Sequence, residues 1–206
     1  MAGVDAVTPW LLRVGIDHTG KIELTRAWDL AVRGPILADL WLSGRISDSG
    51  ETLEIDTSPT DAAYLDTAIY QLATSADSPF EWLGRGALRA SDVADQLVGD
   101  GEWTRHRSLT ASQWRIYRSQ AVQQHVALRR RLAHISDGDE AASSEAEASL
   151  ALLGHALNVV RPDRYGRPEF TRWTEGCGVA APVVDATVLE IVALSGSVHA
   201  NSNPAW

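Results

Sequence analysis

The segment WDLAVRGPILADLWLSGRI, residues 28–46, decides what kind of fold this chain can form. It is apolar along most of its length, as expected of a buried helix, and Ser43–Gly44 is a typical place for that helix to end. Arg33 and the Gly34–Pro35 pair interrupt the apolar pattern. Proline lacks a backbone N–H and crowds the preceding turn, so we expect the helix to kink or to restart at Pro35.

Two interpretations of Arg33 depend on that break. On an unbroken helix, Asp29 and Arg33 are four residues apart and would form a surface ion pair worth about 0.3–0.5 kcal/mol. If the helix restarts at Pro35, Arg33 lies at a helix N-terminus, where free N–H groups and the helix dipole favour an anion. Trp28 would lie about 140° from Arg33 on a continuous helix. Only a break therefore lets the two line one pocket, and otherwise Trp28 packs in the core.

The composition bounds the class of protein. The chain has 206 residues, 45% of them hydrophobic, which suffices for one globular domain. A net charge of −9 disfavours nucleic-acid binding, so any anion site must be a local cluster. Cys177 is the only cysteine, which favours a reducing, cytoplasmic location. We see neither a signal peptide nor a stretch able to span a bilayer.

The spacing of apolar residues and the positions of helix-capping and turn residues predict a mainly α-helical chain with one β-hairpin and a few short strands. Helices are expected to begin at Thr8–Pro9, Ser78 and Ser91, and to occupy residues 59–73, 120–135, 150–160 and 181–194, with a short strand at 52–55. The acidic segment 136–149 has no large apolar residue, which predicts a solvated loop or the fraying start of a helix. We expect one domain over residues 1–195 and a flexible tail over residues 196–206.

Residues 103–119 alternate around a turn-like TAS tripeptide, which predicts the hairpin. Tryptophans and arginines lie along it, namely Trp103, Arg105, Arg107, Trp114, Arg115 and Arg118. A ribbon of this composition suits contact with headgroups or a protein interface, including self-association. The alternative is a solvated hairpin whose aromatic side chains fold onto the core.

No catalytic or metal-binding pattern accompanies these features. The six histidines form no H-x-x-x-H pair, and the chain has no phosphate-binding loop and no nucleophile elbow. Cys177 has no nearby base in the sequence, which favours a structural thiol. We therefore expect a protein that is not an enzyme and that uses neither a cofactor nor a metal.

The order of several segments resembles the Golgi phosphoprotein 3 family, in its bacterial branch. The segments that carry the resemblance are DHTGKI (17–22), RGPILADLWLSGRI (33–46), PTDAAYLDTAI (59–69), SPFEW (78–82), LVGDGEW (97–103) and LALLGHAL (150–157). They span roughly residues 8–160. The resemblance implies a central helical bundle ringed by amphipathic helices, with one protruding hairpin.

The same resemblance implies a peripheral membrane protein, which we expect in the cytoplasm and at the inner face of the membrane. Eukaryotic members of the family bind phosphatidylinositol 4-phosphate with one tryptophan and three arginines in a shallow basic pocket. Arg33 matches the first arginine, and Trp28 matches the tryptophan with a shift of a few positions. The two later arginines fall on alanines, with Arg85 and Arg89 close by but out of register.

We therefore expect a site for an anionic phospholipid headgroup made of Arg33, Trp28, Arg85 and Arg89. The alternative function is that of an interaction module, which self-associates or docks a protein partner through the tryptophan and arginine side chains of the hairpin.

Overall fold

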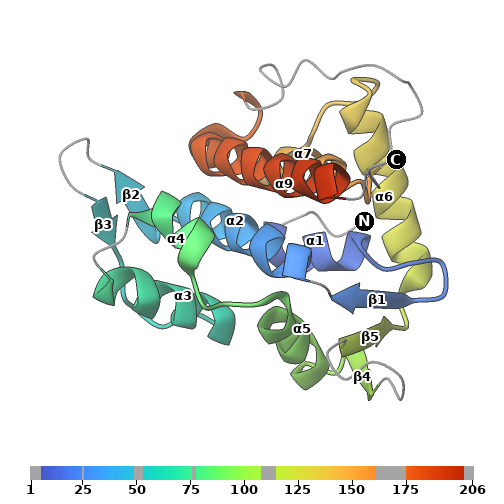
Figure 1. Cartoon of the computed structure of the whole chain (residues 1–206), viewed down its shortest axis with the longest axis horizontal. Coiled ribbons are helices and arrows are strands. Elements are labelled where there is room, and N and C mark those ends of the chain that lie inside the picture. The colour runs from blue at the N-terminus through green and yellow to red at the C-terminus, as the bar shows by residue number, and fades with distance from the viewer. Residues whose placement is uncertain are drawn as a thin grey trace.

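Helix α2 (Arg26–Leu42) is the element on which most of the fold is assembled. The computed structural model describes residues 6–24, 26–48, 53–75, 78–107, 115–160 and 175–201. Three helices pack along α2: α1 (Val7–Val14), α7 (Glu145–Ala156) and α9 (Ala181–Asn201). Figure 1 shows α9 and α7 above α2, with α3 (Ala63–Thr74) and α5 (Ala90–Gly99) below it. The predicted mainly α-helical fold is confirmed.

The predicted restart of the helix at Pro35 is wrong, because α2 runs through Gly34 and Pro35 without ending. The side chains of Val32, Ile36 and Leu37, on both sides of the proline, are fully buried. Each such side chain contributes roughly 1.5–3 kcal/mol on burial. Their sum exceeds the cost of a proline inside a helix, about 3 kcal/mol. Tertiary packing therefore holds together a helix that its local sequence would break.

Gly34 has a separate reason to be glycine. A Cβ atom added there would overlap the Oγ1 and Cγ2 atoms of Thr187 on α9. The missing side chain thus lets α9 approach the backbone of α2 closely. Gly34 marks the point where these two helices cross.

The N-terminus of α1 is held by a residue of α2. The helix begins at Val7 rather than at the predicted Thr8–Pro9 cap, and no side chain of its own caps it. Instead, the backbone N–H groups of Val7 and Thr8 donate to the two carboxylate oxygens of Asp39, at N···O distances of 2.5 and 2.9 Å. Asp39 is only 6% exposed. A buried carboxylate from another helix therefore replaces the local cap.

The core consists of two clusters that share α1 and α2. The first is lined by residues from α2, α3, α5 and the strands, and includes Ile36, Leu37 and Tyr117. The second includes Leu11 of α1, Leu150 of α7 and several residues of α9. Partly buried Trp28 packs against both clusters.

Two small antiparallel sheets flank the helices. The first contains β1 (Lys21–Leu24), β5 (Arg115–Ser119) and β4 (Trp103–Arg107), in the order β1-β5-β4. Trp103 pairs with Ser119 and Arg107 with Arg115, so the hairpin predicted over residues 103–119 is confirmed. The second sheet pairs β2 (Ile46–Asp48) with β3 (Leu53–Ile55), which confirms the strand predicted near residues 52–55.

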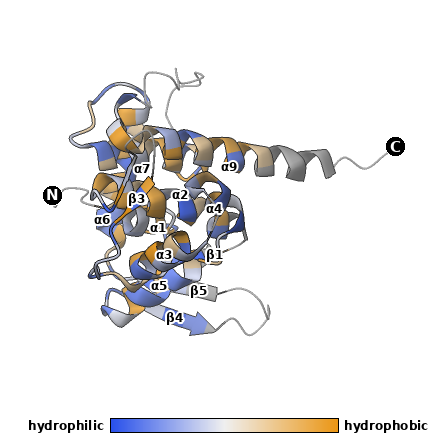
Figure 2. Ribbon diagram, turned by 90° about the vertical axis from the view of Figure 1, so that its left-hand side faces the viewer, coloured by the Kyte–Doolittle hydropathy of each residue, from blue (hydrophilic) through white to orange (hydrophobic). Residues whose placement is uncertain are grey.

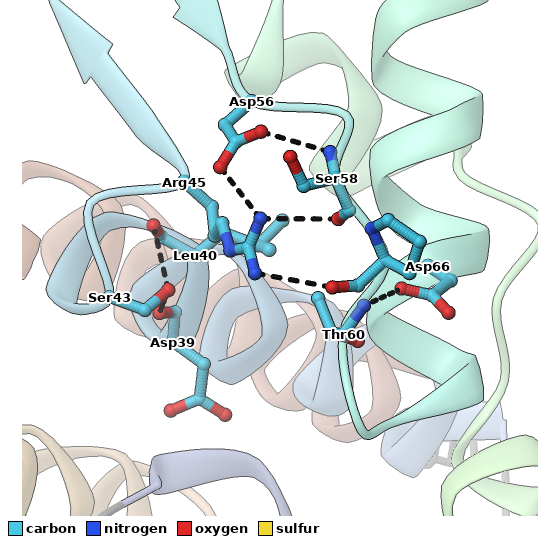
Figure 3. Close-up of polar contacts among 9 residues, drawn as sticks. Asp39, Leu40, Ser43, Arg45, Asp56, Ser58, Thr60 and Asp66 are labelled. Atoms are coloured by element: carbon cyan, nitrogen blue, oxygen red, sulfur yellow. Dashed lines mark hydrogen bonds and ion pairs between the residues drawn. The ribbon is translucent and has the colours of Figure 1, made fainter.

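Arg45, in the turn after α2, fixes the segment that leads into α3. Its Nη1 atom lies 2.6 Å from Oδ2 of Asp56 and 3.1 Å from the carbonyl oxygen of Ser58. Its Nη2 atom donates to the carbonyl oxygen of Pro59 at 3.3 Å. Figure 3 shows this guanidinium between the end of α2 and the segment before α3. Two segments that carry the family resemblance are thus joined to each other by structural contacts.

The remaining elements complete the second half of the chain. Helix α4 (Pro79–Arg85) begins with a capping box between Ser78 and Glu81. Helix α6 (Val122–Ser136) precedes the loop 137–144, and α7 begins at Glu145, so the acidic segment contains both a loop and the start of a helix. A short 3-10 helix, η1 (Gly178–Ala180), leads into α9. α9 continues to Asn201, past its predicted end at residue 194. Among the described residues, none of the helices is long and apolar enough to cross a membrane.

Candidate basic site at the α4–α5 connection

Arg33 contacts the connection between α4 and α5 rather than a helix N-terminus. Its Nη1 atom donates to the carbonyl oxygen of Leu83 at 2.7 Å, and its Nε atom to that of Leu88 at 3.3 Å. Leu83 lies in the last turn of α4, where carbonyl groups have no partner inside the helix. The half-buried guanidinium therefore supplies donors to the C-terminal end of α4.

Asp29 contacts the same connection one turn earlier on α2. Its Oδ1 atom accepts a hydrogen bond from the backbone N–H of Ala90, the first residue of α5, at 3.0 Å. A carboxylate at a helix N-terminus is favoured by the helix dipole. Asp29 and Arg33 thus serve two different helix ends, each with the charge that the end prefers.

Arg85 and Arg89 lie on the segment that these contacts fix. Arg85 is the last residue of α4, Arg89 is the N-cap residue of α5, and both side chains are exposed. The backbone N–H of Arg89 donates to Oδ2 of Asp92 at 2.9 Å, which sets the start of α5. The structure therefore brings three of the four predicted headgroup residues to one connection.

The fourth predicted residue, Trp28, points elsewhere. Its indole lies against Gly15 at the end of α1, where an added Cβ atom would overlap the ring. Because α2 is continuous, Trp28 and Arg33 project about 140° apart. The interpretation of Trp28 as a core residue therefore holds, and the shared pocket with Arg33 does not form.

The hairpin separates its tryptophan from its arginines. Trp103 is 3% exposed and packs on Tyr117, with ring centroids 6.2 Å apart, so this aromatic side chain folds onto the core. Arg105 is exposed and lies 3.2 Å from Asp95 of α5, and Arg118 is also exposed. Figure 2 shows β4 as a largely hydrophilic strand. Trp114 lies outside the described residues, and of Arg107 and Arg115 only the backbone is described.

A serine and a histidine come together that the sequence did not pair. Ser119 Oγ and His125 Nε2 are 2.8 Å apart, and both residues are buried. Burial, with a smaller effect of Arg13, lowers the pKa of His125 to about 4, so its imidazole is neutral at pH 7. Its Nδ1 atom has no hydrogen-bond partner among the described residues. The pair thus lacks a third group to orient the imidazole, and it closes the turn into α6.

Metal binding finds no support in the part of the chain that the structure describes. There, histidine, cysteine, aspartate and glutamate side chains form no group of three or more that could hold an ion. Cys177 is fully buried, and burial raises the pKa of its thiol. This thiol is therefore a packed, protonated side chain.

Comparison with known proteins gives one finding. The family model described as Golgi phosphoprotein 3 (GPP34) matches residues 11–188. The match includes the second half of α1 and extends through η1 into α9, to Val188. It thus reaches beyond the segments on which the resemblance was first seen, and includes the crossing of α2 and α9 at Gly34 and Thr187. No curated protein matches the chain.

Proposed function

Because the chain belongs to the Golgi phosphoprotein 3 family, we propose that it is a peripheral membrane protein that binds an anionic phospholipid headgroup. The site is the α4–α5 connection, with Arg85 and Arg89 in contact with the headgroup and Arg33 behind them. In the family the headgroup is that of phosphatidylinositol 4-phosphate, and a similar phosphorylated headgroup is the preferred ligand here. The protein acts without catalysis, and it meets the membrane from the cytoplasmic side.

One observation carries this proposal: the two hydrogen bonds from Arg33 to the carbonyl oxygens of Leu83 and Leu88. They join the arginine of the first family segment to the short stretch that carries two exposed arginines. Three arginine residues thereby belong to one connection, on a molecule whose net charge is −9. A local cluster of this kind attracts phosphate oxygens even where the overall field is repulsive, since arginine binds them in bidentate geometry.

The roles of the three arginines differ. Arg33 is half-buried and donates to main-chain carbonyl oxygens, so we assign it to positioning the connection. Arg85 and Arg89 are exposed and lie four residues apart, one at the end of a helix and one at the start of the next. Replacement of Arg85 and Arg89 by uncharged residues should therefore reduce lipid binding without loss of the fold.

Vesicle flotation tests the proposal. Phosphatidylcholine vesicles are compared with vesicles that also contain phosphatidylglycerol or phosphatidylinositol 4-phosphate. We expect the protein to float with the anionic vesicles, most strongly with the phosphoinositide, and the double variant Arg85→Gln/Arg89→Gln to remain in the bottom fraction. The control Lys21→Gln removes a positive charge from β1 and should float like the parent. Equal recovery of the parent protein with neutral and anionic vesicles would refute the proposal.

A second candidate function rests on the position of β4. This strand lies at the edge of its sheet, and exposed Thr104, Arg105 and His106 lie along it. An edge strand offers unpaired backbone groups to another chain. The hairpin could thus add a strand from a protein partner or from a second copy. Light scattering of the parent and of an Arg105→Pro variant decides this, because the amide of Arg105 points away from β5 and proline removes that edge donor.

We also propose that residues 1–195 act as one domain. Both core clusters draw on α1 and α2, which supports a single folding unit. Limited proteolysis followed by mass spectrometry tests the limit at residue 195. A stable fragment that ends well before it would contradict the assignment.

A further inference from the structure

A cavity of about 530 Å³ lies on the side of the molecule where α6 passes the end of α1 and the end of α7. Its volume falls within the range of small-molecule sites, roughly 300–1,000 Å³. Part of its wall is apolar and includes Val14, Ile16 and Val126. Basic side chains of α6 line another part, namely Arg129, Arg130 and His134. The α4–α5 connection contributes nothing to this cavity, so it is independent of the proposed headgroup site.

Arg129 is the central polar group of the cavity. Its Nη2 atom donates to the carbonyl oxygen of Ile16, which anchors one end of the guanidinium to the turn after α1. Its Nε atom is buried and has no hydrogen-bond partner among the described residues. Burial lowers the pKa of Arg129, and the charge of Asp17 opposes this effect only in part. A buried N–H donor without an acceptor is costly, so the protein satisfies the Arg129 guanidinium only in part.

The charges around Arg129 favour a negative ligand. Arg130 is exposed beside it, and His134 lies one turn further along α6. Asp17 is the carboxylate of the cavity wall, and its Oδ1 atom accepts from the backbone N–H groups of Thr19 and Lys21 and from the Thr19 hydroxyl. One oxygen of that carboxylate is therefore occupied by its own turn. Two arginine residues and one aspartate line the cavity.

We propose that this cavity binds a phosphate monoester with an apolar body. The phosphate contacts Arg129 and Arg130, and the apolar body lies against Val14, Ile16 and Val126. Arginine suits a phosphate dianion because its planar donors match two oxygens at once. The apolar wall explains why inorganic phosphate alone is a poorer ligand, since it leaves that surface wet. The ester is either a soluble metabolite or the headgroup of a lipid such as phosphatidic acid.

Titration of the full chain with octyl phosphate tests the proposal. Calorimetry measures the affinity, and backbone amide chemical shifts show where the ligand binds. We expect saturable binding, with the largest shifts at Gly15, Ala133 and Asn158, which line the cavity. Inorganic phosphate should bind at least about tenfold more weakly because it lacks the apolar chain. Arg129→Gln should weaken octyl phosphate binding at least about tenfold, the usual scale for loss of a charged hydrogen bond.

Arg129 also bonds to Ile16, so its exchange could disturb the fold. A second variant, Ala133→Phe, fills the cavity and leaves Arg129 and its bond to Ile16 in place. It should abolish binding while the amide spectrum stays native. The control Lys21→Gln removes a positive charge outside the cavity and should leave the octyl phosphate affinity unchanged. Arg129→Gln tests the cavity and Arg85→Gln/Arg89→Gln tests vesicle binding at the proposed headgroup site, so the two proposals fail separately.

Flotation with phosphatidic acid vesicles distinguishes the two sources of the ester. If flotation depends on Arg129, the ligand is a lipid, and if only soluble octyl phosphate shows that dependence, the ligand is a soluble ester. Either result supports the cavity as a phosphate monoester site. Two results overturn it: octyl phosphate produces no shifts at the cavity, or Arg129→Gln and Ala133→Phe both bind it as the parent does.

Discussion

The guanidinium of Arg131 holds the carboxylate of Glu147 at two points, with Nε 2.6 Å from Oε1 and Nη2 3.1 Å from Oε2. This pair joins α6 to α7, and the Glu147 side chain is only 4% exposed. Burial raises the pKa of Glu147, but hydrogen bonds from Arg131 and Ser143 outweigh it and lower the pKa to about 2. The carboxylate is therefore ionised throughout the range in which the protein is expected to function.

Replacement of Arg131 by Gln should destabilise the protein by about 2–3 kcal/mol at pH 7, since it leaves a buried carboxylate without its cation. Because the folded-state pKa of Glu147 lies below its ordinary value of 4.5, the stabilisation is present above pH 4.5 and is lost as the pH falls toward 2. The difference in unfolding free energy between parent and variant should thus shrink below pH 4.5. Urea unfolding at several pH values measures it, with exposed Arg130→Gln as the control.

Gly34→Ala should destabilise the fold by about 1–3 kcal/mol, the usual cost of overpacking, because the new methyl group overlaps Thr187. A second change, Thr187→Ala, should recover part of the loss. Gly84→Ala is the matched control: this glycine also lies in a helix, but an added Cβ atom meets nothing within 4 Å. It should stabilise by up to about 1 kcal/mol. Thermal unfolding that ranks Gly34→Ala and Gly84→Ala equally would contradict the close crossing of α2 and α9.

His125 should make the stability of the protein depend on pH between about 4 and 6.5. Its pKa is lowered from 6.5 to about 4 in the folded state, so its stabilisation is full above pH 6.5 and is lost as the pH falls to 4. The effect amounts to about 3 kcal/mol at most. His125→Gln keeps a polar group for Ser119 but does not titrate, so its unfolding free energy should vary less over this range. The exposed His134→Gln variant should behave as the parent does.

Asp39→Ala should destabilise the N-terminal end of α1. Loss of two hydrogen bonds to Val7 and Thr8 costs about 1–2 kcal/mol, as for other helix caps. Hydrogen exchange should accelerate at these two amides before it does elsewhere in α1. Asp185→Ala, an exposed change on α9, is the control. Unchanged protection of Val7 in Asp39→Ala would show that the carboxylate does not cap the helix in solution.

The sequence predicted those features that depend on local pattern. The hairpin at 103–119 follows from alternation, and the helix at 59–73 from the spacing of residues such as Ala68 and Ile69. The continuity of α2 could not be predicted in this way. Local rules correctly identify Pro35 as a helix breaker, but the burial that overrides it comes from α9 and from residues far along the chain.

The candidate site shows the same limit. Arg33, Arg85 and Arg89 were identified from the family pattern, and the structure places them at one connection. The partners of Arg33 are carbonyl oxygens 50 and 55 residues away. Every residue carries a carbonyl oxygen, so a sequence motif cannot identify these partners. Trp28 was misplaced because its position depends on the break in α2 that does not occur. Arg129 was overlooked because the cavity around it is formed by three segments distant in sequence.

The contacts of Arg45 have a consequence for how the chain tolerates change. One side chain ties together the two ends of an interval of 14 residues, up to Pro59, and it does so through a carboxylate and two main-chain oxygens. Two of the three acceptors belong to the backbone, so mutation of neighbouring side chains cannot remove them. These contacts have three acceptors at one end of the interval, so the loss of one acceptor leaves two. At the other end they all depend on the side chain of Arg45. Variation should be tolerated at Asp56 and Ser58, while replacement of Arg45 removes all three side-chain contacts at once.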